Sequence, residues 1–320
     1  MRDVSERQSE LIWWFYCHCR ENDYNLPVAG KELGKDGSTI YRLFSGTYAA
    51  KLDNLCQDIE RYQKIVTERA STVKMSFVET SISRTIWKAC DGALITQTVA
   101  MIYGDSQIGK TTAIEEYARR NNHGQTKLMR MPASAGVQLF MRELARACYV
   151  STNRSFEGMR DSVMKTLDDK TLVIIDEAHQ AFTSYQKGSQ IKVMELIREI
   201  YDRTHCGLVL VGTNVWRDEL NQGKQCQLLE QLRRRGTIKI QLPSRPPKAD
   251  LDRISKKFGL SPAEGDSAEV VKDMIHTSGL GMYVKFLQNA SRIAARENKP
   301  LTWEHFVTGY DIIKKLSAGL

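Results

Sequence analysis

A glycine-rich segment, GDSQIGKT, has the residue types and spacing that bind phosphate, and it fits the pattern G-x-x-x-x-G-K-[ST] in full. Its glycines let the backbone N–H groups wrap a polyphosphate. Lys110 would neutralise the β and γ charge, and Thr111 would ligate Mg²⁺. We therefore predict an ATP site formed by Gly104, Asp105, Ser106, Gln107, Ile108, Gly109, Lys110, Thr111 and Thr112.

A second segment with candidate catalytic residues is TLVIIDEAH, in which an apolar run ends in two adjacent carboxylates. This is the layout of a Walker B segment, in which Asp176 would hold Mg²⁺ through water and Glu177 would act as general base. The alternative is a solvated strand end. The letters DEAH also spell a helicase box, but the roughly 140 mostly helical residues after Asp176 cannot hold the second RecA-like domain that such helicases need. We place His179 beside the site or on the surface.

The phosphate-binding and carboxylate segments need strands to position them, and the sequence pattern predicts such strands. Apolar runs rich in β-branched residues alternate with helical patterns, which is typical of a parallel α/β sheet. Three prolines within LPSRPPKAD then precede a stretch with about four amphipathic helices and no convincing strand. The expected domains are a helix-turn-helix over 1–66, a linker over 67–80, a nucleotide-binding core over 81–246 and a helical lid over 247–320. The expected strands are TVAMIY, KLMRM, TLVIID, GLVLVG and TIKIQL.

The order of P-loop strand, intervening strand, Walker B strand and sensor strand resembles the AAA+ ATPases. That resemblance makes Asn214 a sensor 1 residue that reaches the γ-phosphate or the lytic water. It also implies an arginine finger among Arg233, Arg234 and Arg235, although a basic turn that complements a helix dipole explains any one of them equally well. Lys285 stands where a sensor 2 arginine is usual, and a lysine lacks the bidentate fork of arginine.

The stretch GSTIYRLFSGTY near the N-terminus predicts the second helix of a helix-turn-helix. Ser38 would cap it, and Ile40, Leu43 and Phe44 would form its core face. A helical module used for protein contacts is the alternative. The side chains left pointing outward, and suited to phosphates or base edges, are Thr39, Tyr41 and Arg42.

Composition limits the possible partners. The 320 residues carry 46 Lys and Arg against 38 Asp and Glu, and the net charge of +8 favours a polyanion such as nucleic acid. The N-terminus lacks the layout of a signal peptide, and LIWWFYC is too short to cross a bilayer, so we expect a cytoplasmic protein. The seven cysteines are scattered, which favours reduced thiols, and the CHC run lacks the further ligands of a zinc site.

The chain as a whole resembles the MuB-like transposition ATPases, whose relatives include TnsC, TniB and IstB. The resemblance rests on a small helix-turn-helix followed by an AAA+ module, and on the run IREIYDRTHCGLVLVGTN. It implies an ATP-dependent ATPase of the bacterial cytoplasm that binds duplex DNA with little sequence preference and assembles into a filament. In this family the filament marks target DNA, and a docking transposase stimulates ATP hydrolysis. Arg154, in the loop region between the second and third strands, is then a DNA-contact candidate or a plain exposed arginine.

Two other functions fit the same residues. One is a remodeller resembling the helicase loaders, which share the fold and act on a protein partner. The other is a transcriptional regulator in which the ATPase switches a helix-turn-helix at one operator. All three functions use the same ATPase chemistry. They differ in what ATP hydrolysis acts on.

Overall fold

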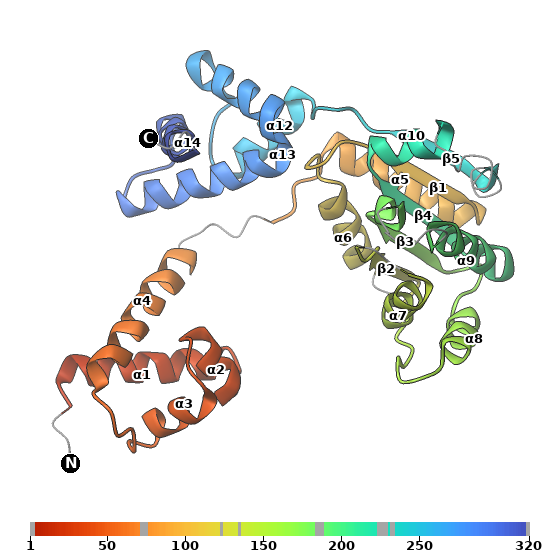
Figure 1. Cartoon of the computed structure of the whole chain (residues 1–320). Coiled ribbons are helices and arrows are strands. Elements are labelled where there is room, and N and C mark those ends of the chain that lie inside the picture. The colour runs from red at the N-terminus through yellow and green to blue at the C-terminus, as the bar shows by residue number, and fades with distance from the viewer. Residues whose placement is uncertain are drawn as a thin grey trace. The chain divides into compact units, whose positions relative to one another are not determined.

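The predicted apolar runs form one five-stranded parallel sheet in the computed structural model, which describes residues 4–70, 76–121, 124–133, 136–182, 189–222, 230 and 234–317 (Figure 1). The strand order is β2-β3-β4-β1-β5, and every observed pairing is parallel. All five predicted strands are confirmed: β1 (Val99–Tyr103), β2 (Thr126–Arg130), β3 (Leu172–Asp176), β4 (Gly207–Gly212) and β5 (Gly236–Gln241).

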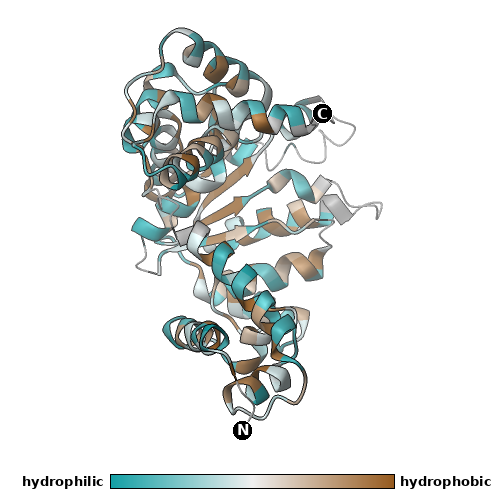
Figure 2. Cartoon of the chain, turned by 90° about the vertical axis from the view of Figure 1, so that its left-hand side faces the viewer, coloured by the Kyte–Doolittle hydropathy of each residue, from teal (hydrophilic) through white to brown (hydrophobic). Residues whose placement is uncertain are grey.

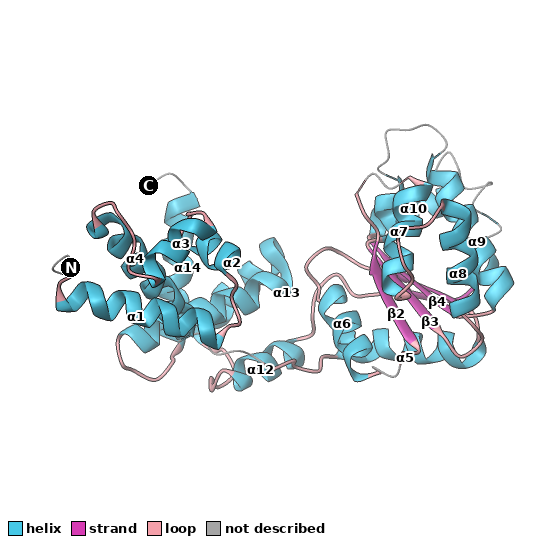
Figure 3. Ribbon diagram, turned by 90° about the horizontal axis from the view of Figure 1, so that it is seen from below, coloured by secondary structure: helices cyan, strands magenta, loops and turns pink. Residues whose placement is uncertain are grey.

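Helices cover both faces of the sheet, which buries β1, β3 and β4 along their whole length (Figure 3). Two separate apolar cores result, and the strand ribbons between them are coloured hydrophobic in Figure 2. Strand β4 packs closely against α5, since a Cβ on Gly207 would lie 2.7 Å from the carbonyl oxygen of Ala93. One face carries α5 (Ser81–Thr96) and α6 (Lys110–Arg120), and the other carries α7 (Val137–Ala147), α8 (Phe156–Thr166), α9 (Ser189–Thr204), the 3-10 turn η1 (Ala178–Phe182) and α10 (Asn214–Gln222).

The segment after the sheet is helical, as the sequence predicts. Its elements are α12 (Lys248–Lys257), α13 (Gly265–Arg296) and α14 (Trp303–Ser317). Gly279 interrupts α13 with φ 76° and ψ 179°, so the long helix is two helices joined at a kink. Tyr283 and Phe286, which follow the kink, pack their rings against Phe306 and so hold α14 on α13.

The chain divides into two units. One contains Met1–Lys74 with Gln288–Pro300, and the other contains Met75–Leu287 with Leu301–Leu320. The second unit thus holds the sheet, α12, the first part of α13 and α14. Among the described residues, no helix has the length and apolar character needed to cross a membrane.

Four helices at the N-terminus enclose their own small core. Phe15, Ile40, Leu55 and Ile59 lie at its centre, each at most 1% exposed. Burial of each such side chain contributes roughly 1.5–3 kcal/mol to folding. The helices are α1 (Glu6–Glu21), α2 (Leu26–Glu32), α3 (Gly37–Phe44) and α4 (Leu52–Ala70).

The start of α3 differs from the expectation. Asp36, and not Ser38, is its N-cap: the Asp36 carboxylate accepts the backbone N–H of Thr39 at 2.7 Å and the Ser38 hydroxyl at 2.7 Å. A carboxylate there also complements the positive end of the helix, and these bonds hold the pKa of Asp36 below its usual range. The predicted core face is confirmed, since Ile40 and Leu43 are buried and Phe44 packs against the same core.

The CHC run lies on α1. His18 stacks on Trp14 with ring centroids 5.2 Å apart, and its Nε2 lies 3.3 Å from the hydroxyl of Tyr62. Cys19 is buried, which raises the pKa of its thiol to about 11. These residues therefore contribute to the packing of the N-terminal core.

Candidate nucleotide-binding site

The P-loop connects the end of β1 to the start of α6. Gln107 and Gly109 take positive φ angles of 61° and 93°, which curls the loop around the helix end. Gly104 lies against Leu242, the residue that follows β5, because a Cβ on Gly104 would be 3.0 Å from the Cβ of Leu242. Within the described residues no side chain caps α6 at Gly109. Its first N–H groups are therefore available to an anion, and the helix dipole adds to that attraction.

Lys110 is held inside this loop. Its ammonium donates to the carbonyl oxygens of Gly104 at 2.9 Å and Asp105 at 2.7 Å, and the residue is only 8% exposed. Burial lowers the pKa of Lys110, and the charges of Glu177 and Asp176 act in the opposite direction. A buried, paired cation thus sits at the centre of a loop shaped for phosphate.

Thr111 and Asp176 meet across the front of the loop. The Thr111 hydroxyl donates to Oδ2 of Asp176 at 2.7 Å, and the aspartate is 3% exposed at the end of β3. Its other oxygen accepts the backbone N–H of Glu177 at 2.8 Å. Hydroxyl and carboxylate oxygens are the ligands that Mg²⁺ prefers. The residues present therefore fit a magnesium ion shared with a bound phosphate.

Glu177 follows directly, in a positive-φ conformation at 55°. The guanidinium of Arg130, at the end of the neighbouring strand β2, lies 3.7 Å from Oε1. Nδ1 of His179 lies 3.2 Å from Oε2. Of the two positions expected for His179, beside the site or on the surface, the structure has the first, whereas Arg130 was not predicted. The position of Arg130 at the carboxyl end of an expected strand was the available signal.

Asn214 lies next to the P-loop. Its amide donates to Oδ1 of Asp105 at 2.6 Å, and its carbonyl oxygen accepts Nε2 of Gln241 at 2.8 Å. Gln241 in turn accepts from Arg217 at 2.7 Å. A polar network thus joins the ends of β4 and β5 to the loop. Gln241 and Arg217 have no sequence motif to reveal them.

Arg234 and Arg235 lie near the amino end of β5, at the opposite end of the parallel strands from the P-loop. Arg235 precedes β5, so it stands at the amino end of a strand, whereas the P-loop follows the carboxyl end of β1. Arg234 pairs with Glu230 at 2.7 Å and Arg235 pairs with Asp202 at 2.7 Å. Arg233 lies outside the described residues. Neither described arginine belongs to this chain's own nucleotide site.

A cavity of about 600 Å³ opens beside the P-loop at Gly109 and Thr112. The backbone N–H of Gly281, on α13, donates to the carbonyl oxygen of Gln107 at 3.0 Å, which joins the helical segment to the loop. Lys285 lines the cavity as an exposed side chain. The cavity is large enough for a ribose and base next to phosphates held at the P-loop. Its apolar lining consists of Phe77, Val78, Ile254, Leu280 and Val284.

The candidate DNA contacts lie apart from one another in the sequence and differ in exposure. Tyr41 is 60% exposed, Arg42 is exposed and Thr39 is half-buried on α3. Arg154 is exposed before α8 and donates to the hydroxyl of Ser162 at 2.8 Å. These residues are accessible, and their role remains a prediction.

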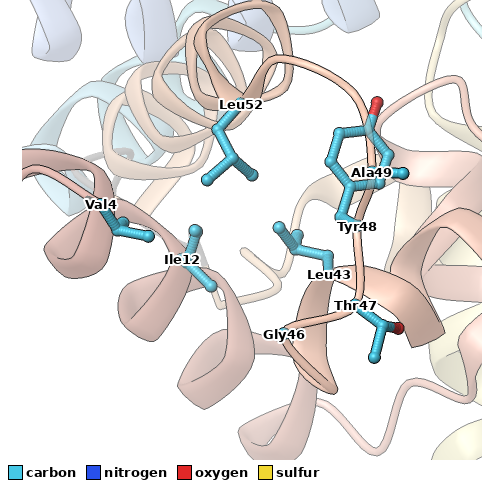
Figure 4. Close-up of a pocket in the computed structure, with 8 residues that line it drawn as sticks. All are labelled: Val4, Ile12, Leu43, Gly46, Thr47, Tyr48, Ala49 and Leu52. Carbon is cyan, nitrogen blue, oxygen red and sulfur yellow. The ribbon is translucent and has the colours of Figure 1, made fainter. Parts of the chain in front are cut away.

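A hollow of about 470 Å³ lies in the N-terminal helical core (Figure 4). Ile12, Leu43 and Leu52 converge on it from α1, α3 and α4. Thr47 and Tyr48 share its lining with these apolar side chains. Because Leu43 of α3 faces this hollow, any DNA contact by α3 depends on side chains on the other faces of the helix.

The fold and the site define a P-loop protein of the AAA+ class. A family model described as an AAA domain matches residues 94–220. A crystal structure of Cdc6p from Pyrobaculum aerophilum shares the fold, with a TM-score of 0.51 and 13% identity over 73% of this chain and 67% of that one.

Two similar proteins narrow the class. Mu-like prophage FluMu DNA transposition protein B of Haemophilus influenzae is 22% identical over 272 residues, 82% of this chain and 89% of that protein. ATP-dependent target DNA activator B of Escherichia phage Mu is 24% identical over 271 residues, 82% of this chain and 81% of that protein. The present chain thus contains a match to an AAA domain and is similar to MuB-type transposition proteins over most of its length.

Proposed function

We propose that this protein is an ATP-dependent activator of target DNA in transposition. The observation that carries the proposal is the joined site, in which Lys110 fills the P-loop and Thr111 bonds to Asp176. It occurs in a chain similar over 82% of its length to a protein named ATP-dependent target DNA activator B. The same similarity favours this function over the helicase loader and the transcriptional regulator.

In this proposal each residue of the site has a separate role in ATP hydrolysis. The loop N–H groups and Lys110 bind the phosphates, and Thr111 and Asp176 would hold Mg²⁺, which would supply positive charge against the phosphates. Glu177 accepts a proton from the attacking water, and Asn214 orients that water or the γ-phosphate. The products are ADP and phosphate.

Assembly would follow from the position of the arginines. In the proposal, Arg233, Arg234 or Arg235 reaches the γ-phosphate bound by the next copy, so ATP stabilises the interface between copies. A head-to-tail interface of this kind that does not close into a ring generates a helix. The net charge of +8 supplies contacts to the DNA backbone, which makes binding weaker at high salt. The remaining partner is a transposase, whose docking stimulates hydrolysis.

Electron microscopy tests the proposal. The protein is mixed with duplex DNA and a non-hydrolysable ATP analogue at low salt, and we expect helical filaments on the DNA. Lys110→Ala, which removes the phosphate-binding ammonium, is the matched control and should give bare DNA. Isolated monomers of the wild-type protein under these conditions would contradict the proposal.

A further inference from the structure

Asp250 is a fully buried carboxylate that the proposed chemistry does not use. It lies in the first turn of α12, is 1% exposed, and is 169 residues away from its main partner in the sequence. That partner is Ser81, the first residue of α5. The Ser81 backbone N–H lies 3.0 Å from Oδ1 and 2.9 Å from Oδ2, and the Ser81 hydroxyl donates to Oδ2 at 2.6 Å.

These bonds explain how the charge is tolerated. A carboxylate removed from water is costly unless it is paired or hydrogen-bonded. Here it meets the positive end of the 16-residue helix α5, whose first N–H has no partner within the helix. Arg253 adds a longer contact at 3.4 Å from α12 itself. The arrangement ties the start of α12 to the start of α5.

Both tied elements form walls of the cavity beside the P-loop. Ile254, one turn after Asp250, lines it from α12. Thr80 and Ser83 line it from α5, where they make a capping box with bonds of 3.1 and 2.9 Å. Val78, just before the cap, lines it as well. One carboxylate therefore links two walls of the same cavity.

Phe77, which lines the cavity from the segment before α5, is held by contacts that do not involve Asp250. The ring of Phe77 stacks on Trp87, with centroids 5.5 Å apart. The guanidinium of Arg120 lies 4.4 Å from the centre of the Trp87 ring and 5.8 Å from that of Phe77. This wall is thus anchored on α5 and α6 independently of Asp250. Loss of the Asp250 tie should release α12 from the wall and leave the P-loop in place.

We propose that Asp250 is a positioning residue for the nucleoside part of the bound nucleotide. By fixing α12 against the N-terminus of α5, it sets the spacing of the cavity walls that contact ribose and base. The inference rests on the proposed nucleotide binding. It adds that Asp250 controls the part of the site that contacts the ribose and base. The phosphate end depends on Lys110 and the loop N–H groups, which do not contact Asp250.

The test compares two ligands by isothermal titration calorimetry: Mg-ATP, and Mg-tripolyphosphate, which has the phosphates but no nucleoside. We expect Asp250→Asn to weaken ATP binding about tenfold or more and to change tripolyphosphate binding less than about twofold. Ser81→Ala keeps both backbone bonds and should weaken ATP about threefold. Lys257→Ala, which removes an exposed side chain at the end of α12, is the control and should bind both ligands like the wild type.

The ligand comparison separates positioning from general damage. Unchanged ATP affinity in Asp250→Asn would overturn the inference, and so would an equal loss of both ligands. If Asp250→Asn fails to fold, Ser81→Ala decides the matter, and an ATP-to-tripolyphosphate ratio equal to that of the wild type would overturn the inference. A wild-type protein that binds neither ligand would overturn the proposed nucleotide binding itself, which is a distinct result.

Discussion

The P-loop edge of the sheet and the outer face of α3 represent two kinds of candidate site. At the P-loop edge, Lys110 and Asp176 are buried, and each has bonding partners at 2.7–2.9 Å. On α3, Tyr41 and Arg42 are exposed. The first site is defined by contacts within the chain. The second depends on a partner to give its side chains a role.

This difference has a physical basis. Buried polar groups must satisfy one another, so their arrangement restricts the ligand that can enter. Exposed charges on a helix are solvated, and the same guanidinium fits DNA phosphate, a carboxylate or water. A change at the P-loop edge should therefore affect function strongly through few atoms. A change on α3 should act weakly and only when the partner is present.

The largest effect is expected for Lys110→Ala. In the proposed complex the Lys110 ammonium would bond to phosphate oxygens, and the loss of about two such charge-assisted bonds, each contributing roughly 2 kcal/mol, should lower ATP affinity about 10³-fold. Isothermal titration calorimetry measures the loss, and Lys170→Ala, at an exposed turn before β3, is the control. Retained ATP affinity in Lys110→Ala would show that the P-loop is not the nucleotide site.

Glu177→Gln should separate binding from chemistry. Loss of the general base lowers the rate of hydrolysis by about 10²-fold or more, whereas ATP affinity should stay near that of the wild type. A phosphate-release assay with duplex DNA measures the rate, and negative-stain microscopy should show longer-lived oligomers. A variant that hydrolyses ATP at the wild-type rate would assign the base to another residue.

The sheet could be predicted because its signals are local. Each strand is a short run of five or six residues, rich in β-branched residues except in β2, and the P-loop lies in one continuous segment between a strand and a helix. The capping box at the start of α1 was not predicted. Ser5 and Gln8 form a capping box there, and the S-x-x-Q spacing in SERQ was available as a signal. The N-cap of α3 was misplaced by two residues because Asp36 and Ser38 are both good caps and the sequence alone does not rank them.

The supporting residues of the site could not be predicted, because their contacts join distant parts of the chain. Asp250 meets Ser81 across 169 residues, and Gln241 meets Asn214 across 27. Arg130 approaches Glu177 only because β2 and β3 are neighbours in the sheet. Strand order is a property of the folded chain, so no local pattern reports these pairs.

A core substitution in the N-terminal helices tests how far the two regions are independent. Ile40→Ala leaves a cavity in the small core and should lower its stability by about 2–5 kcal/mol. Differential scanning calorimetry should show a lower melting temperature for the N-terminal unit, with ATP affinity unchanged. Tyr41→Ala, next to it but exposed, should melt like the wild type. Lost ATP affinity in Ile40→Ala would mean that the regions depend on each other.

The smallest effect is expected on the outer face of α3. If Arg42 contacts a DNA phosphate, Arg42→Ala should weaken ATP-dependent binding to duplex DNA about three- to tenfold for every sequence tested. The slope of log affinity against log salt should then become shallower by about one, since one fewer counterion is released. Arg61→Ala, an arginine with a 76% exposed side chain on α4, is the matched control for lost charge. Equal effects of the two substitutions would show that α3 contributes only general charge, and an unchanged affinity would favour protein contacts as its role.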